Sequence, residues 1–187
     1  MSAFHLKSML LGALCLMNTA ASAIPVEAST LEARQNTYPR IAWSFSISGS
    51  AIINDDENWP SDDERWSGTI TPSTFVLNPG ANRLYTWSQA MGGEIRAELD
   101  LRPTTYAANL QQYPNLAYAI RLYEGDNENT NDLDGQTSGD ITFAREGATN
   151  QASVNFQRRV TNTNENTPDD FVDLTITVTA TPVIVWA

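Results

Sequence analysis

Cysteine, histidine and lysine are nearly missing from this sequence of 187 residues. The single Cys (Cys15), the single His (His5) and the single Lys (Lys7) all lie in the N-terminal stretch MSAFHLKSMLLGALCLMNTAASA. Without that stretch, the chain has no thiol for a disulfide or a nucleophile, and no imidazole or amine to activate a serine. It also lacks the ligands that zinc, copper and haem sites normally use. What remains is the chemistry of carboxylates, Tyr and Arg, together with hard cations that bind oxygen.

The N-terminal stretch has the three parts of a secretory signal peptide. His5 and Lys7 give it a polar, basic start, and an apolar run from Met9 to Met17 follows. That run is too short to cross a bilayer of roughly 30 Å as a helix. Ala21-Ser22-Ala23 then matches the small-residue cleavage pattern. We therefore predict a signal peptide over residues 1–23 and a mature chain that is secreted and extracellular.

Positive charge is scarce as well. After residue 23 the chain holds ten Arg residues against 22 Asp and Glu residues, which gives a net charge of −12. Such a chain repels phosphate backbones and anionic lipid surfaces. We therefore expect neither nucleic acid nor membranes as partners, and look instead for an extracellular ligand, either a carbohydrate or a protein.

Two segments follow the signal peptide. Residues 24–37 show no strong hydrophobic period and are predicted to be a disordered linker or a short propeptide cut after Arg34. Residues 38–187 are predicted to be one domain. A domain of about 150 residues buries some 70% of its unfolded surface, which is enough for stability without disulfides.

Most of the chain after residue 38 alternates between apolar and polar residues with period two. This pattern is typical of strands with one buried and one wet face. Clear runs are IAWSFSISG, GEIRAELDL, AYAIRLY, GDITFA, ASVNFQRRV and VDLTITVTA, and less regular runs lie around residues 66–77 and 83–90. Pro72 predicts an edge position or a bend for its strand. In the last clear run, the predicted buried residues are Val172, Leu174, Ile176 and Val178, and the predicted exposed ones are Asp173, Thr175 and Thr177.

These runs, separated by Gly and Pro, predict an all-β fold. We expect a single antiparallel β-sandwich of seven or eight strands, with immunoglobulin-like or C2-like architecture, and a closed barrel is the alternative. One short helix is expected in a crossover, over the stretch TTYAANLQQYP (residues 104–114). There, Tyr106, Leu110 and Tyr113 recur at helical spacing, and Pro114 would end the helix.

Two acidic stretches are candidates for a cation site: NDDENWPSDDERW (residues 54–66) and YEGDNENTNDLDGQTSGD (residues 123–140). Calcium takes six to eight oxygen ligands, which such loops can supply. An EF-hand is excluded, because its first and last ligand places would be Thr130 and Ile141. A looser calcium site is proposed from Asp126, Glu128, Asp132 and Asp134. The alternative is a solvated loop, since these residue types are also ordinary turn residues.

Tryptophan provides the candidate ligand-binding residues. Trp59 and Trp66 flank the acidic part of the first stretch, and Trp87 lies in a weak strand. An exposed indole beside Asp, Asn and Arg can stack on a sugar ring while the polar groups bind its hydroxyls. The alternative is packing in the core, where bulky aromatic side chains are mostly found. Trp43 is assigned to the core, because it lies on the apolar face of its strand.

The favoured function is that of a secreted, acidic binding module with a calcium-stabilised loop, and not of an enzyme. One alternative is a small glycan-active enzyme that uses a pair of carboxylates about 5 to 10 Å apart. The other is a structural protein of a surface or matrix. An exposed aromatic residue with polar neighbours would favour binding, paired acids across a cleft would favour catalysis, and a long bare strand edge would favour a structural role.

Overall fold

The computed structural model describes residues 39–56, 64–106, 113–125, 129, 131–143, 151–163 and 170–186. Its strands are β1 (Pro39–Asp55), β2 (Glu64–Leu77), β3 (Tyr85–Met91), β4 (Ile95–Thr104), β5 (Asn115–Tyr123), β6 (Leu133–Thr142), β7 (Ala152–Thr161) and β8 (Phe171–Trp186). Within these ranges there is no helix of the length and apolar character that spanning a membrane requires. Residues 1–38, which hold the predicted signal peptide and linker, lie outside the described part. Thr37–Ala187 belong to one compact unit.

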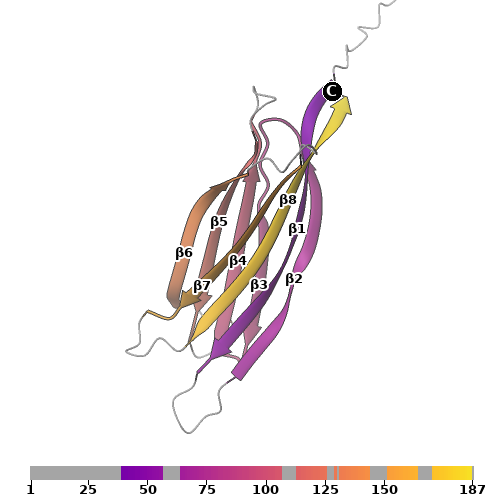
Figure 1. Cartoon of the computed structure of the whole chain (residues 1–187). Coiled ribbons are helices and arrows are strands. Elements are labelled where there is room, and N and C mark those ends of the chain that lie inside the picture. The colour runs from indigo at the N-terminus through magenta and orange to yellow at the C-terminus, as the bar shows by residue number, and fades with distance from the viewer. Residues whose placement is uncertain are drawn as a thin grey trace, which may run out of the picture. The chain divides into compact units, whose positions relative to one another are not determined.

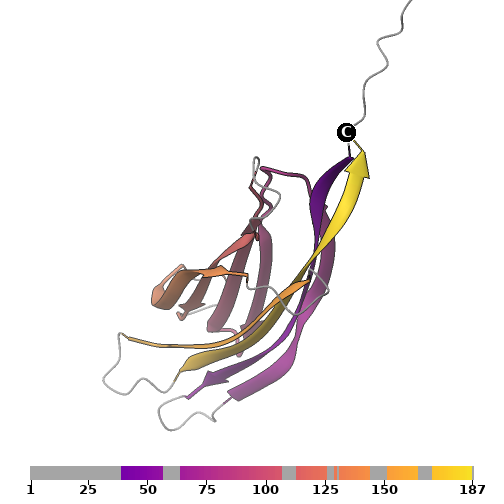
Figure 2. The ribbon, with the colours of Figure 1, turned by 45° about the horizontal axis from the view of Figure 1, so that its top comes forward.

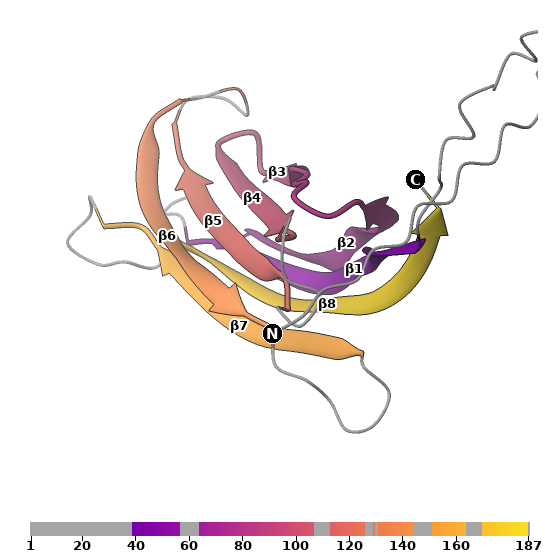
Figure 3. The same ribbon diagram turned by 90° about the horizontal axis from the view of Figure 1, so that it is seen from above.

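The strands form two antiparallel sheets of four strands each (Figure 1). Sheet A has the order β2-β1-β8-β7, and sheet B has the order β3-β4-β5-β6. Seen from above, sheet B lies as a second layer over sheet A (Figure 3). The predicted all-β sandwich of seven or eight strands is therefore confirmed, with eight. The first and last strands, β1 and β8, lie side by side at the centre of sheet A.

The core lies between the two sheets and is built from alternate residues of each strand. Phe45 of β1 is fully buried and contacts Phe75 of β2, with 5.7 Å between ring centroids. Its ring centroid also lies 6.0 Å from that of Phe143, the residue that directly follows β6 of the other sheet. Trp43 is buried as predicted. These contacts join the two layers into one hydrophobic cluster.

Strand β8 confirms the predicted buried face. Val172, Leu174, Ile176 and Val178 are at most 1% exposed. The opposite face is more covered than the sequence predicts, because Asp173, Thr175 and Thr177 are half-buried. The reason is the position of β8 between β1 and β7, where side chains of both neighbours flank it on either face.

Pro72 marks an edge strand, as predicted. It lies in β2, which is hydrogen-bonded only to β1. The pairing shifts register between Ile47 and Gly49 of β1, so that Thr71 and Pro72 lie opposite the single residue Ser48. An extra residue of this kind bends the strand and places the proline where no ladder hydrogen bond is lost.

The short helix predicted over residues 104–114 is absent from the described residues, which is a correction. Thr104 is the last residue of β4, and the backbone N–H of Thr105 donates to the carbonyl of Ala81 at 2.9 Å. The buried Thr105 hydroxyl donates to the carbonyl of Asn78 at 2.6 Å. These bonds tie Thr105 to the β2–β3 connection. Residues 107–112 lie outside the described part.

Close backbone contacts and hydrogen bonds join the two sheets on the side where the edge strands β6 and β7 meet. A Cβ at Gly135 would lie against the carbonyl oxygen of Thr161, so only glycine allows this approach. The amide and the hydroxyl of Thr163 donate to the carbonyl of Asp134 at 3.0 and 2.6 Å. Farther along β7, Arg158 donates to the Tyr118 hydroxyl at 3.0 Å. A charge that points inward from an edge strand also discourages pairing with another chain.

The antiparallel order brings four connections to one end of the sandwich: β1–β2, β3–β4, β5–β6 and β7–β8 (Figure 1). We call this the acidic end, because fifteen of the 22 Asp and Glu residues lie in these connections or beside them in the sequence. They are Asp55, Asp56, Glu57, Asp62, Asp63, Glu64, Glu94, Glu124, Asp126, Glu128, Asp132, Asp134, Glu165, Asp169 and Asp170.

Candidate functional site

The two acidic stretches meet a third one at the acidic end. The backbone N–H of Asp56 donates to the Asp170 carboxylate at 2.7 Å, which links the first stretch to the β7–β8 connection. The Asn162 amide donates to the Glu124 carboxylate at 2.7 Å, which links the second stretch to the same connection. This third segment was not among the stretches predicted from the sequence to form a site. Its signal was the run NTNENTPDD between two clear strands, with Asp169 and Asp170 at its end.

The predicted cation ligands are only partly described. Asp126 and Glu128 lie outside the described residues. Asp132 is exposed, and its carbonyl accepts the backbone N–H of Glu124 at 3.2 Å. Asp134 is buried beside Thr163. In the described ranges, no three Asp, Glu, His or Cys side chains lie together in a way that could hold a metal ion.

The three candidate tryptophans do not form an open platform in the described part of the chain. Trp59 lies outside it. Trp87 is only 7% exposed and belongs to the core cluster. Trp66 is half-buried, packs against that cluster and lies 6.1 Å from Trp87 between ring centroids. A Cβ at Gly68 would strike the Trp66 ring, so the indole lies close over its own strand. Together, Trp66 and Trp87 close the side of the sandwich where β2 and β3 face each other.

The outer face of sheet A carries hydroxyl groups in regular rows. In β1 and β8 they pair directly as Ser44 with Thr181, Ser46 with Thr179, Ser48 with Thr177, and Ser50 with Thr175. The flanking strands extend these rows with Thr69 and Thr74 of β2 and with Ser153, Asn155 and Gln157 of β7. Paired residues of neighbouring strands share one face of a sheet. None of these residues carries a charge, although the protein as a whole is strongly acidic.

A depression of about 440 Å³ lies at one end of these rows. It is lined by Ser50, Ile52, Gln157, Arg158, Arg159, Asp173, Leu174 and Thr175. Its size falls in the range of about 300–1,000 Å³ that is typical of small-molecule sites. It combines two hydroxyls, one amide, two apolar residues, one ion pair and a second arginine, all contributed by the three strands β1, β8 and β7.

The ion pair at this depression has a fixed geometry. Arg159 donates to both carboxylate oxygens of Asp173, at 2.8 Å from Nε, and its guanidinium lies 4.0 Å from the centroid of the Phe171 ring. The hydrogen bond with Asp173 raises the pKa of Arg159 above its usual value. A planar pair held in this way offers both a donor and an acceptor edge to a ligand.

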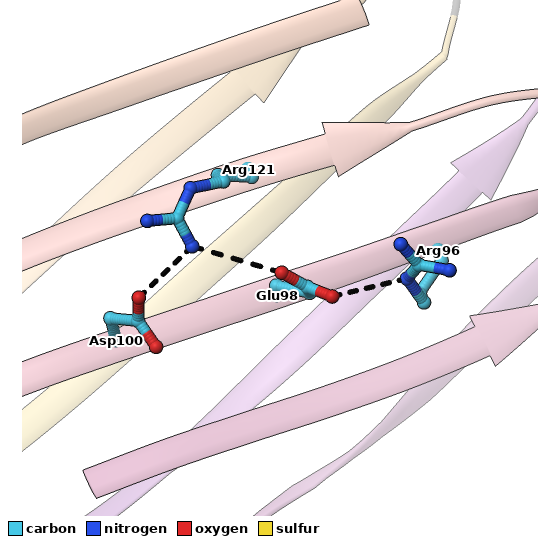
Figure 4. Close-up of polar contacts among 4 residues, drawn as sticks. All are labelled: Arg96, Glu98, Asp100 and Arg121. Carbon is cyan, nitrogen blue, oxygen red and sulfur yellow. Dashed lines mark hydrogen bonds and ion pairs between the residues drawn. The ribbon is translucent and has the colours of Figure 1, made fainter. Parts of the chain in front are cut away.

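The outer face of sheet B is charged instead (Figure 4). Arg121 of β5 contacts Asp100 at 2.9 Å and Glu98 at 3.7 Å, and Arg96 contacts Glu98 at 3.2 Å. Arg96 also lies over the ring of Tyr123, 4.5 Å from its centroid. The hydrogen bond with Asp100 raises the pKa of Arg121 above its usual value. Glu98 and Asp100 thus neutralise arginines across β4 and β5, which is a role in sheet stability.

The sequence matches no protein-family model and no curated protein.

Proposed function

We propose that the protein is a secreted binding module that acts outside the cell and binds its ligand on the outer face of sheet A. The observation that carries this proposal is the depression beside Arg159 and Asp173, at the end of uncharged hydroxyl rows. Of the two partner classes expected from the sequence, this chemistry favours a carbohydrate. Sugar hydroxyls can exchange hydrogen bonds with Ser, Thr and Gln, while Ile52 offers an apolar contact.

A neutral carbohydrate fits better than an anionic one. The net charge of −12 that the chain has after residue 23 repels polyanions, and the hydroxyl rows add no positive charge to offset that repulsion. The glycan-active enzyme has less support, because Glu98 and Asp100 are already paired with arginines on an open sheet face. The proposal also includes a calcium-stabilised acidic end, which rests on the density of oxygen ligands there.

The test is binding of the mature chain to soluble neutral glycans: a β-glucan, a xylan and oligomers of N-acetylglucosamine. Polygalacturonate is the anionic control. Calorimetry should detect binding to at least one neutral glycan and none to polygalacturonate. Thr175→Val removes one hydroxyl at the depression and keeps the shape of the side chain. Because one hydrogen bond contributes about 0.5–1.5 kcal/mol, this change should weaken binding by about 2- to 10-fold.

Thr86→Val is the matched control, since Thr86 is an exposed threonine on a strand of sheet B. It should leave binding unchanged. Equal affinities for the parent and Thr175→Val would place the ligand elsewhere on the protein. Failure to bind every neutral glycan would refute the choice of carbohydrate.

A further inference from the structure

The two central strands of sheet A run past the rest of the sandwich. β2 pairs with β1 only as far as Trp43, and β7 pairs with β8 only as far as Ala180. Beyond these points, residues 39–42 and 183–186 pair only with each other, from Ala42 with Val183 to Pro39 with Trp186. We call this two-stranded projection the tip ribbon. It is visible at the C-terminal end of β8 in Figures 1 and 2.

One side of the tip ribbon continues the buried face of sheet A. Val178 and Ala180 are completely buried, and the alternation places Pro182, Ile184 and Trp186 on the same side of β8. Here, however, Ile184 and Trp186 are each 69% exposed. Their partners across the ribbon are Ile41 and Pro39. The apolar face therefore outruns the layer that covers it.

The exposed apolar face of the tip ribbon is expected to bind a partner surface. An isolated pair of strands is only marginally stable in water, and exposed apolar strands are association sites. Large exposed apolar residues that cluster on one surface usually mark an interface.

We propose that the cover is a second copy of this chain, bound through the tip ribbon around a two-fold axis. The distribution of charged residues favours a tip-to-tip arrangement of the two copies. The ribbon contains no carboxylate, and Arg40 is its one charged residue. The acidic end lies at the other end of β1, whose 17 residues span about 56 Å. Two copies that meet tip to tip thus keep their acidic ends many Debye lengths apart, since that length is about 8 Å at physiological salt.

The exposed area sets the strength of the contact. An aromatic side chain buries about 150–250 Å², so Ile184 and Trp186 supply only a few hundred Å² from each copy. This is less than the roughly 1,200 Å² in total that stable interfaces reach. The dimer should therefore be weak and populated at high protein concentration. A two-fold axis suits it, because the same apolar patch then covers itself in both copies.

The experiment measures the mass of the mature chain by sedimentation velocity from about 5 µM to about 1 mM. The weight-average mass should rise from that of a monomer toward twice that value as the concentration rises. The double variant Ile184→Thr, Trp186→Ser should stay monomeric throughout. Val76→Thr is the matched control, since Val76 is 52% exposed on β2, on the outer face of sheet A opposite to the face of Ile184 and Trp186, and it should dimerise like the parent.

A disulfide trap checks the contact without depending on the double variant. The mature chain has no cysteine, so Ile184→Cys introduces a unique thiol close to the proposed axis. Under mild oxidation it should form covalent dimers at least about tenfold faster than Val76→Cys. A parent chain that is monomeric at every concentration would overturn the proposal and leave the ribbon to a different partner. Equal rates of trapping at positions 184 and 76 would also overturn it.

Discussion

Replacing Ile176 with Ala tests the packing of sheet A at its centre. Ile176 is fully buried in β8 and lies between Gly49 of β1 and Phe156 of β7. A buried Ile→Ala change costs about 2–5 kcal/mol, with the larger values where the surroundings cannot collapse. Gly49 has no side chain to move into the space, and a Cβ there would already strike the carbonyl of Thr175. We therefore expect a loss in the upper half of that range, about 3–5 kcal/mol.

The measurement is unfolding in urea, with the slope of the transition compared between variants. An unchanged slope with a lower midpoint shows a change in stability alone. For a domain of this size, each kcal/mol shifts the melting temperature by about 2–4 °C, so the melting temperature should fall by about 6–20 °C. Thr175→Ala, at the neighbouring half-buried position, is the control and should cost less than about 1 kcal/mol. Equal losses at positions 175 and 176 would refute the face assignment of β8.

Three further outcomes are expected. Calcium at a hundredfold excess over its dissociation constant should stabilise the fold by about 2.7 kcal/mol more than NaCl does at matched ionic strength. The double variant Asp132→Asn, Asp134→Asn should lose that difference. An equal response to NaCl would mean that the loop is only solvated. Thr105→Val should cost about 1–3 kcal/mol in urea unfolding, because it removes the buried hydroxyl that binds the β2–β3 connection, and a neutral result would contradict that role. Burial raises the pKa of Tyr85 above its ordinary value near 10, so the unfolded chain loses this proton first. The corresponding stability is present below pH 10 and is lost as the pH rises through the folded pKa, and Tyr85→Phe should make the alkaline decline shallower.

The periodicity of the sequence was sufficient to predict the fold class and most strand faces. Alternation with period two depends only on which side of a strand each residue faces, so it identified the buried set of β8 without knowledge of its neighbours. Pro72 likewise indicated an edge strand through its missing N–H alone. Both signals are local, which is why a single sequence reveals them.

Features that depend on strand neighbours could not be predicted in this way. The hydroxyl rows exist because β1 lies beside β8, so that Ser48 pairs with Thr177 across most of the chain length. Trp66 and Trp87 were ambiguous for the same reason, since their burial depends on β2 facing β3. The expected helix failed because Thr105 is bound by a distant connection, a contact that local spacing does not reveal.

Strand order also explains how a chain with a net charge of −11 can keep surfaces of low charge. Alternating antiparallel strands send every second connection to the same end, and those connections hold most of the carboxylates. Repulsion is thereby concentrated at the acidic end, where carboxylates such as Asp170 are held by backbone and amide donors. Apart from the Arg159–Asp173 pair and Arg40, the hydroxyl rows on the outer face of sheet A and the tip ribbon carry uncharged side chains. Ligand binding and self-association are therefore proposed on these two surfaces, where the charge of the protein opposes contact least.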